Sequence, residues 1–172
     1  MRTTDIQLGL EQYIQLQNFD FSFFVVGFHG FDIYNATHQM GYNLIKSQQM
    51  AGVTPMRELL NRWTPTNTNT DIPGFVKGGT ENKDFFSTRF VENGSFIKMK
   101  SITLGYTLPE ATCRSLGINN LRVYASVQNP FHITKYSGLD PEATMGSPLV
   151  QGVDWGAYPN SRNYLIGLNF SF

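Results

Sequence analysis

The chain has 172 residues, enough for one domain with a buried core. Charged residues make up only 15%, against roughly 25% in a typical soluble domain, and the formal net charge is zero. A neutral chain offers no electrostatic case for a nucleic-acid partner or an anionic membrane surface. The single cysteine, Cys113, excludes an intrachain disulfide and a CxxC metal or redox motif.

Five segments alternate apolar and polar residues, which is the pattern of β-strands. The polar side carries mainly Gly, Ser, Thr, Asn and Gln instead of the charges of an exposed soluble strand. This composition suits the polar lumen of a large barrel, but a β-sandwich core alternates as well, so the pattern alone leaves both folds open. In chain order the predicted strands comprise residues 5–13, 19–31, 100–108, 120–129 and 163–172.

The links between the predicted strands differ in length. Residues 14–18 and 109–119 form short links, whereas roughly sixty residues separate the second and third strands, far more than an ordinary loop. Another long link separates the fourth and fifth strands. Because successive strands run in opposite directions, both long links fall on one rim, which is typical of outer-membrane barrels.

The first long link contains a predicted short helix. Thr54 is the expected N-cap and Pro55 fits the first helical position, and they are followed by apolar residues at helical spacing: Met56, Leu59, Leu60 and Trp63. Residues 64–74 form a polar, turn-rich linker. No stretch reaches the length of a membrane helix, and the first residues lack the features of a signal peptide, so either the chain is cytoplasmic or its true N-terminus lies elsewhere.

Catalytic and metal-binding patterns are absent from the sequence. His29, His38 and His132 do not have metal-ligand spacing, and Cys113 lies in a predicted turn with no evident histidine partner. Asp140 and Glu142 could form a carboxylate pair for acid–base catalysis. With Pro141 between them, a turn is the preferred interpretation. We therefore expect no metal, no cofactor and no enzymatic activity.

A few loop residues invite a functional reading. Trp63 and Trp155 lie in the long links, where an exposed aromatic could stack on a sugar or meet a partner, although packing within the loop is at least as reasonable. Asn35 and Asn93 match the glycosylation pattern, but two ordinary loop asparagines are the stronger interpretation.

Residues 90–143 resemble the C-terminal part of SusC-like TonB-dependent outer-membrane transporters of the Bacteroidetes type. The pieces that carry the resemblance are "SFIKMKSITLGYTLP", "LRVYASVQNPFHITKYSGLDPE" and the terminal "NYLIGLNFSF". Upstream, "NFDFSFFVVGFHGFDIYNAT" and "LNRWTPTNTNTDIPG" resemble the same family in the same order. The resemblance to this family, which is also called SusC/RagA-like, thus covers nearly the whole chain.

The resemblance implies an all-β fold: about five C-terminal strands of a large antiparallel transmembrane barrel of about 22 strands. Residues 1–172 are expected to be barrel, 32–94 and 134–161 extracellular loops, and the plug domain is expected to be absent. The implied function is import of oligosaccharides or peptides across the outer membrane. The implied partners are a SusD-like surface lipoprotein, outer-membrane lipid, and the TonB complex acting through a missing N-terminal part.

The alternation and the resemblance together assign the two faces of the expected barrel wall. Lumen-facing candidates are Ser101, Thr103, Thr107, Arg122, Tyr124, Ser126, Gln128, Asn163 and Asn169. Lipid-facing candidates are Ile102, Leu104, Tyr106, Val123, Val127, Ile166, Leu168 and Phe170. By resemblance, the last strand is a barrel-closing and insertion signal, with Tyr164, Ile166, Leu168, Phe170 and Phe172 on its apolar face.

Two alternatives remain at this stage. The chain could be a soluble β-sandwich module that binds carbohydrate through Trp63 and Trp155. It could also be a glycoside hydrolase that uses Asp140 and Glu142. Neither explains the terminal Phe172 or the long links on one side.

Overall fold

The computed structural model describes residues 4–42, 56–74, 87–115, 117–143 and 152–171. Its internal contacts divide the chain into two units. The first, here called the sheet unit, comprises Met1–Asp32, Asn93–Tyr136 and Pro159–Phe172. The second, here called the loop unit, comprises Ile33–Glu92 and Ser137–Tyr158.

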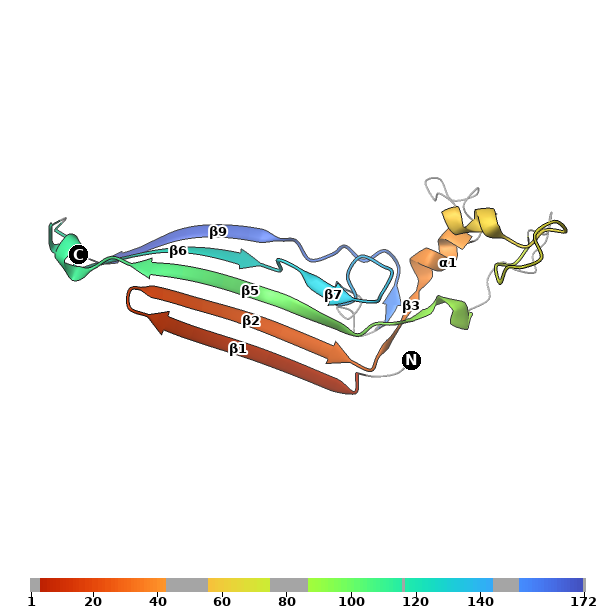
Figure 1. Ribbon diagram of the computed structural model, residues 1–172, viewed down its shortest axis with the longest axis horizontal. Helices are drawn as coiled ribbons and strands as arrows, with labels where there is room; N and C mark the ends of the chain where they lie inside the picture. The colour runs from red at the N-terminus through yellow and green to blue at the C-terminus, as the bar shows by residue number, and fades with distance from the viewer. Residues whose placement is uncertain (1–3, 43–55, 75–86, 116, 144–151, 172) are drawn as a thin grey trace. The chain divides into compact units, whose positions relative to one another are not determined.

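The sheet unit is built on one antiparallel sheet in which all five predicted strands are neighbours (Figure 1). These strands are 9 to 12 residues long, about the length that a tilted strand needs to cross a bilayer. The prediction of an all-β fold with long antiparallel strands is confirmed. In sheet order the strands are β1 (Ile6–Leu16), β2 (Phe19–His29), β5 (Phe96–Thr107), β6 (Asn120–Gln128) and β9 (Asn163–Ser171), and the short β7 (His132–Thr134) also pairs with β5.

The two short links differ in detail from the prediction. β1 continues to Leu16, so only Gln17 and Asn18 join it to β2, and Gln17 adopts a positive φ of 52°. The second link forms helix α3 (Glu110–Ser115). Cys113 lies in this helix and is buried, so its predicted position in a turn was wrong.

A β-bulge interrupts the pairing of β2 with β5. Phe24 pairs with Ser101, but the next residue, Val25, pairs with Met99, which leaves Lys100 as the extra residue. An extra residue reverses the side-chain alternation beyond it, and Lys98 therefore lies on the same face as Ser101. Lys98 is only 2% exposed there. The regular alternation that predicted the strand contains no sign of this bulge.

The loop unit contains a small three-stranded sheet in the order β4, β3, β8. Polar and aromatic residues surround this sheet. Its core is formed by Tyr34, Ala36 and Phe90, with Tyr42 and Val153 packed against them. None of its strands was predicted, because they are short and their partners are distant in sequence. The elements are β3 (Asp32–Asn35), α1 (Ala36–Tyr42), β4 (Val91–Asn93), β8 (Val153–Asp154) and the 3-10 helices η1 (Arg57–Asn61) and η2 (Thr88–Phe90).

The helix predicted in the first long link is present only as η1. It begins at Arg57, and Trp63 lies beyond its end, so the predicted helical position of Trp63 was wrong. Thr54 and Pro55, the predicted cap and first position, lie outside the described residues. Among the helices of the described residues, none is long and apolar enough to span a membrane.

Candidate functional site

The sheet register gathers the predicted lumen-facing residues on one face. Thr103 lies opposite Ser126, and their hydroxyl oxygens are 2.9 Å apart. Asn163 lies opposite Gln128 and donates from Nδ2 to Oε1 at 3.3 Å. The remaining pairs continue the same row: Ser101 with Gln128, Thr107 with Arg122, Gly105 with Tyr124, and Arg122 with Asn169. These residues form the polar face of the sheet.

An ion pair crosses three strands of the polar face. Arg122 of β6 donates from Nε to Asp20 Oδ1 at 2.8 Å and from Nη2 to Asp20 Oδ2 at 2.5 Å. Between them, on β5, lies Gly105, whose register partners are Asp20 and Tyr124. A Cβ atom at Gly105 would approach Asp20 Oδ1 to 2.3 Å and Arg122 Nη2 to 2.6 Å. The two-pronged contact therefore requires glycine at this position.

The polar face continues from Arg122 to the last strand. The guanidinium carbon of Arg122 lies 5.0 Å from the ring centre of Tyr124, within the range of a cation–π contact. The same ring covers Gly167 of β9, where an added Cβ would come within 2.3 Å of Tyr124 Cζ. Asp20 and Gly167 were not singled out from the sequence, although Asp20 stands on the polar side of its strand.

The opposite face of the sheet is apolar and exposed. The register places the predicted lipid-facing residues together: Ile102 with Val127, Leu104 with Ala125, and Tyr106 and Leu168 with Val123. Leu104 is 52% exposed and Ile166 is 81% exposed. Such a large exposed apolar surface marks a membrane or partner interface rather than a soluble surface.

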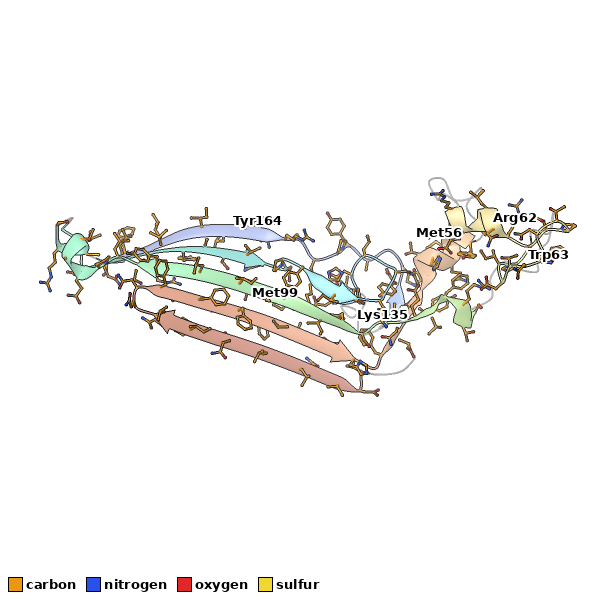
Figure 2. The ribbon with its side chains drawn as sticks, viewed as in Figure 1. Met56, Arg62, Trp63, Met99, Lys135 and Tyr164 are labelled. Atoms are coloured by element: carbon orange, nitrogen blue, oxygen red, sulfur yellow. The ribbon has the colours of Figure 1, made fainter. Side chains whose placement is uncertain are left out.

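The last strand, β9, carries the predicted closing residues except one. Tyr164, Ile166, Leu168 and Phe170 alternate along its apolar side, and Phe172 lies outside the described residues. Tyr164 of β9 and Met99 of β5 are labelled in Figure 2. Among the described strands β9 pairs only with β6, and β1 only with β2, so each has one unpaired edge.

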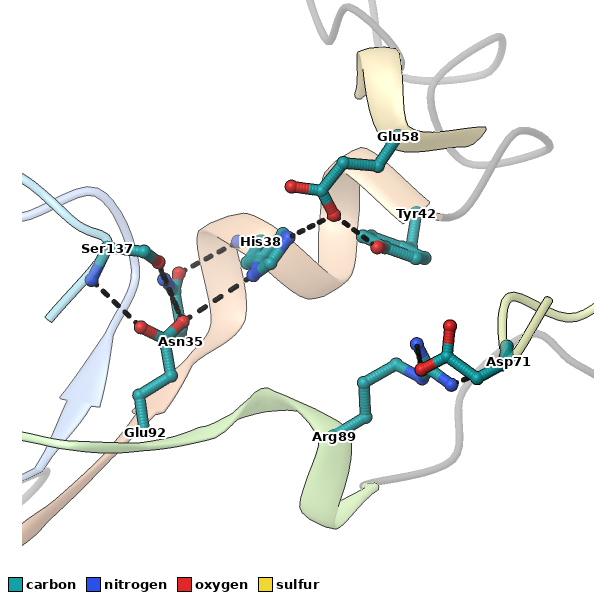
Figure 3. A network of polar contacts seen from close by, with 8 residues as sticks. All are labelled: Asn35, His38, Tyr42, Glu58, Asp71, Arg89, Glu92 and Ser137. Carbon is teal, nitrogen blue, oxygen red and sulfur yellow. Dashed lines mark hydrogen bonds and ion pairs between the residues drawn. The ribbon is translucent and has the colours of Figure 1, made fainter. Parts of the chain in front are cut away.

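A second polar cluster lies in the loop unit, around Glu92 of β4 (Figure 3). Asn35 donates to Glu92 Oε1 at 2.9 Å, and Ser137 donates to the same carboxylate from its backbone N and its hydroxyl, both at 2.8 Å. Asn35 Oδ1 in turn accepts from the backbone N of His38 and caps α1. Burial alone would raise the pKa of Glu92, but these hydrogen bonds outweigh it, so its pKa lies below the ordinary value.

His38 of α1 lies between two carboxylates. Its Nε2 is 3.5 Å from Glu58 Oε2, and its Nδ1 is 3.5 Å from Glu92 Oε1. The Tyr42 hydroxyl also donates to Glu58, which lowers the pKa of that carboxyl. Burial, with the neighbouring Glu58 carboxylate, raises the pKa of Tyr42 to about 12. The network thus joins β3, α1, η1 and β4 within the loop unit.

The other predicted candidates do not form a site. Trp63 and Trp155 are both partly exposed, and within the described part of the chain no ring contact joins them. Among the described residues, no three metal-ligating side chains lie close enough together to hold a metal ion. This applies to His29, His38 and His132 as well. Asp140 Oδ1 accepts the backbone N–H of Glu142 at 3.0 Å, as in the predicted turn. The buried Cys113 thiol donates a hydrogen bond to the carbonyl oxygen of Leu108, with 3.7 Å between sulfur and oxygen.

The two candidate glycosylation sites also have structural roles. Asn35 is 3% exposed and its amide is held by Glu92 and Ser137, so it is not an acceptor for a glycan in this fold. Asn93 is exposed, and its Oδ1 accepts the backbone N–H of Ser95. Asn35 ends β3 and caps α1, so the interpretation of it as an ordinary loop asparagine was wrong, although its burial agrees with the absence of a glycan.

Comparisons with known sequences point to one class of protein. The chain is 34% identical to TonB-dependent receptor P3 of Formosa agariphila over 176 residues, which cover 99% of this chain and 16% of that receptor. It is 33% identical to TonB-dependent receptor SusC of Bacteroides thetaiotaomicron over 170 residues, which cover 98% of this chain and 15% of SusC. No family model matches the chain.

Solved structures agree with the sequence relatives. The RagAB peptide importer in its closed-closed state matches with a TM-score of 0.82 and 29% identity, over 99% of this chain and 17% of that chain. Its open-open state matches with a TM-score of 0.79 and 28% identity, over 99% and 17% of the two chains. The chain therefore spans less than a fifth of the length of these relatives.

These matches indicate the class: the chain resembles one part of TonB-dependent receptors in sequence and in fold. Within that class it resembles the SusC/RagA-like type in sequence and has the fold of the C-terminal part of the receptor barrel, as the sequence predicted. The relatives are receptors and importers, which confirms the prediction that the chain is not an enzyme.

The contact of Asp20 with Arg122 over Gly105 yields a first prediction. Gly105→Ala places a methyl group inside the ion pair, so we expect the barrel that contains these strands to lose about 1–3 kcal/mol of stability. The temperature at which the folded band disappears on a gel measures the loss. Gly27→Ala is the control, because the nearest atom to its new Cβ, Ile97 Cγ1, is 3.9 Å away. Equal melting temperatures of the two variants would show that the contact of Asp20 with Arg122 does not depend on glycine at position 105.

The lowered pKa of Glu92 yields a second prediction. A depressed pKa stabilises the loop unit above the ordinary pKa of 4.5, and that contribution is lost as the pH falls through the lower native pKa. Glu92→Gln should reduce local stability by about 1–3 kcal/mol at neutral pH and remove this acid-dependent loss. Hydrogen exchange of α1 and β4, corrected for the intrinsic pH dependence, measures both effects.

The matched control for Glu92→Gln is Glu110→Gln. Glu110 is 85% exposed, and within the described part of the chain it pairs only with Arg114, one helical turn away. This change should leave the exchange of α1 and β4 unaltered at every pH. An acid-dependent loosening that persists in Glu92→Gln would show that another group is responsible.

Proposed function

We propose that these residues form the C-terminal strands and two outer loops of a TonB-dependent importer in the bacterial outer membrane. The observation that carries the proposal is the likeness, along nearly the whole chain, to the RagAB peptide importer and to SusC. The apolar face of the sheet, which is exposed in the structure, supports contact with membrane lipid. The substrate class proposed for the whole receptor is oligosaccharides or peptides.

The parts of the chain have separate roles in this proposal. The polar face, with Arg122 and Tyr124 at its centre, lines the lumen or contacts the plug. The apolar face meets lipid, and β9 closes the barrel by pairing its free edge with the first strand of the receptor. Residues 32–94 and 134–161 are the extracellular loops, and a SusD-like lipoprotein covers the barrel from outside. The TonB complex acts on a part of the receptor beyond these residues.

The exposed face argues against the alternative of a soluble β-sandwich. A sandwich buries the apolar side of each sheet against a second one. Here Leu10 is 57% exposed, Leu104 is 52% exposed and Ile166 is 81% exposed. These three residues stand on three different strands, so the exposure extends across the sheet. A lipid-facing wall accounts for this surface, and a soluble domain does not.

Cell fractionation tests the localisation. An antibody against residues 163–171 should detect, in the outer-membrane fraction of the source cells, a band several times heavier than 19.4 kDa. The band should change its mobility when the sample is heated, as folded outer-membrane barrels do. A soluble band at 19.4 kDa would contradict the proposal and favour a free-standing domain.

The proposed orientation of the two faces is tested by Leu104→Arg. A cation near the middle of the bilayer on the lipid face should cost about 2–4 kcal/mol of barrel stability. Ser101→Arg on the polar face is the matched control and should have a much smaller effect, because that face meets water or polar groups. The urea midpoint of the receptor in lipid vesicles measures both. A neutral Leu104→Arg, or a reversed order, would show that the faces are exchanged.

A further inference from the structure

His38 lies where several elements of the loop unit meet (Figure 3). Its ring belongs to α1, whereas Glu58 belongs to η1 and Glu92 to β4. The Nε2 atom is 3.5 Å from Glu58 Oε2, and Nδ1, which is shielded from solvent, is 3.5 Å from Glu92 Oε1. Each ring nitrogen therefore faces a carboxylate, and the two carboxylates come from elements that are far apart in the sequence.

Other donors hold both carboxylates in place. The Tyr42 hydroxyl donates to Glu58, and Ser137 donates to Glu92 from its backbone N and its hydroxyl. The hydrogen bond from Tyr42 lowers the pKa of Glu58, and the bonds to Glu92 outweigh its burial and lower its pKa as well. Both groups are therefore ionised at mildly acidic and neutral pH, and an ionised carboxylate only accepts hydrogen bonds.

The number of N–H groups on an imidazole depends on its protonation state. A neutral ring carries one N–H, so it can donate to only one of the two carboxylates and turns a lone pair toward the other. A protonated ring carries two and can donate to both, in charge-assisted bonds that are stronger than neutral ones. Because two facing acceptors repel and an imidazolium attracts both carboxylates, this geometry favours the protonated ring. In that form His38 links η1 to β4 through α1.

The other charged groups around α1 do not reverse this preference. Within the described part of the chain, the cation that lines a cavity together with His38 is Arg89 of η2. Its Nη1 is 3.3 Å from Asp71 Oδ2, and its Nη2 donates to the Asp71 carbonyl oxygen, so Asp71 balances its charge. On β8, which contacts α1, the carboxylate of Asp154 accepts two backbone N–H groups of the turn that follows the strand. The two carboxylates that face the ring therefore dominate its electrostatic environment.

We propose that His38 is a proton-operated clasp of the loop unit, which joins η1 and β4 to α1 when the ring is protonated and releases one of them when it is neutral. The clasp stabilises the loop unit below the usual titration range of histidine, about pH 6.5, and this contribution is lost as the pH rises beyond that range. Its sign is opposite to that of Glu92, whose contribution is lost only in stronger acid. The proposed import function places the loop unit outside the membrane, so the clasp responds to the acidity of the surroundings of the cell.

The test measures hydrogen exchange of α1 and η1 in the intact receptor, purified from the outer membrane in detergent. Exchange is followed between about pH 5 and pH 8, where histidine changes its charge, and is corrected for the intrinsic pH dependence. It should be about tenfold slower at the acidic end, the effect of one hydrogen bond gained. His38→Gln keeps a donor and an acceptor but gains no proton in this range, so it should abolish the pH dependence. His132→Gln, on β7 of the sheet unit, is the control and should retain it.

Glu58→Gln keeps the test valid if His38→Gln disturbs α1. A neutral amide at this position donates as well as accepts, so the neutral ring can bond on both sides and the pH dependence should shrink. Exchange in the unmodified receptor that does not slow toward acid, or a pH dependence that survives in His38→Gln, would overturn the proposal. Either result leaves the receptor in the outer membrane and the import function intact. A receptor absent from the outer membrane would instead contradict the import function.

Discussion

The structure depends on the register of the antiparallel sheet. Side chains alternate with a period of two, so a slip of one residue would move every polar side chain of a strand to the apolar face. The contact of Asp20 with Arg122 opposes such a slip, because it spans three strands and fits only over a glycine at 105. Tyr124 over Gly167 extends the same constraint to β9. Two small residues thus allow the long side chains of the polar face to fix the pairing.

A fixed register gives the sheet one polar face and one apolar face. The polar face satisfies its own groups through contacts such as Thr103 with Ser126, and the apolar face remains exposed. Under the proposed function this division separates the lumen from lipid. The loop unit is built differently, around the hydrogen-bonded Glu92 and a small aromatic core.

The sequence predicted what depends on local pattern. Each of the five long strands was found because alternation is visible within a few residues, and the polar and apolar sets share faces as expected. The bulge at Lys100 was not predictable, since one extra residue in β5 leaves no local signal. The pairs Asp20 with Arg122 and Asn35 with Ser137 each span 102 positions, and no pattern in either strand announces its partner. Helix α1 was missed because its cap, Asn35, was considered as a glycan acceptor or as an ordinary loop asparagine, and not as an N-cap.

The alternation of β9 in the membrane is the most direct test of this account. With Cys113 first replaced by alanine, single cysteines at residues 163–171 carry a spin label in the intact receptor, and oxygen dissolved in the lipid reports which labels face the bilayer. The account predicts high oxygen contact at Tyr164, Ile166, Leu168 and Phe170. It predicts low contact at Leu165, which is apolar but lies opposite Ser126 on the polar face. Uniform contact along the strand, or Leu165 joining the lipid-facing set, would contradict it.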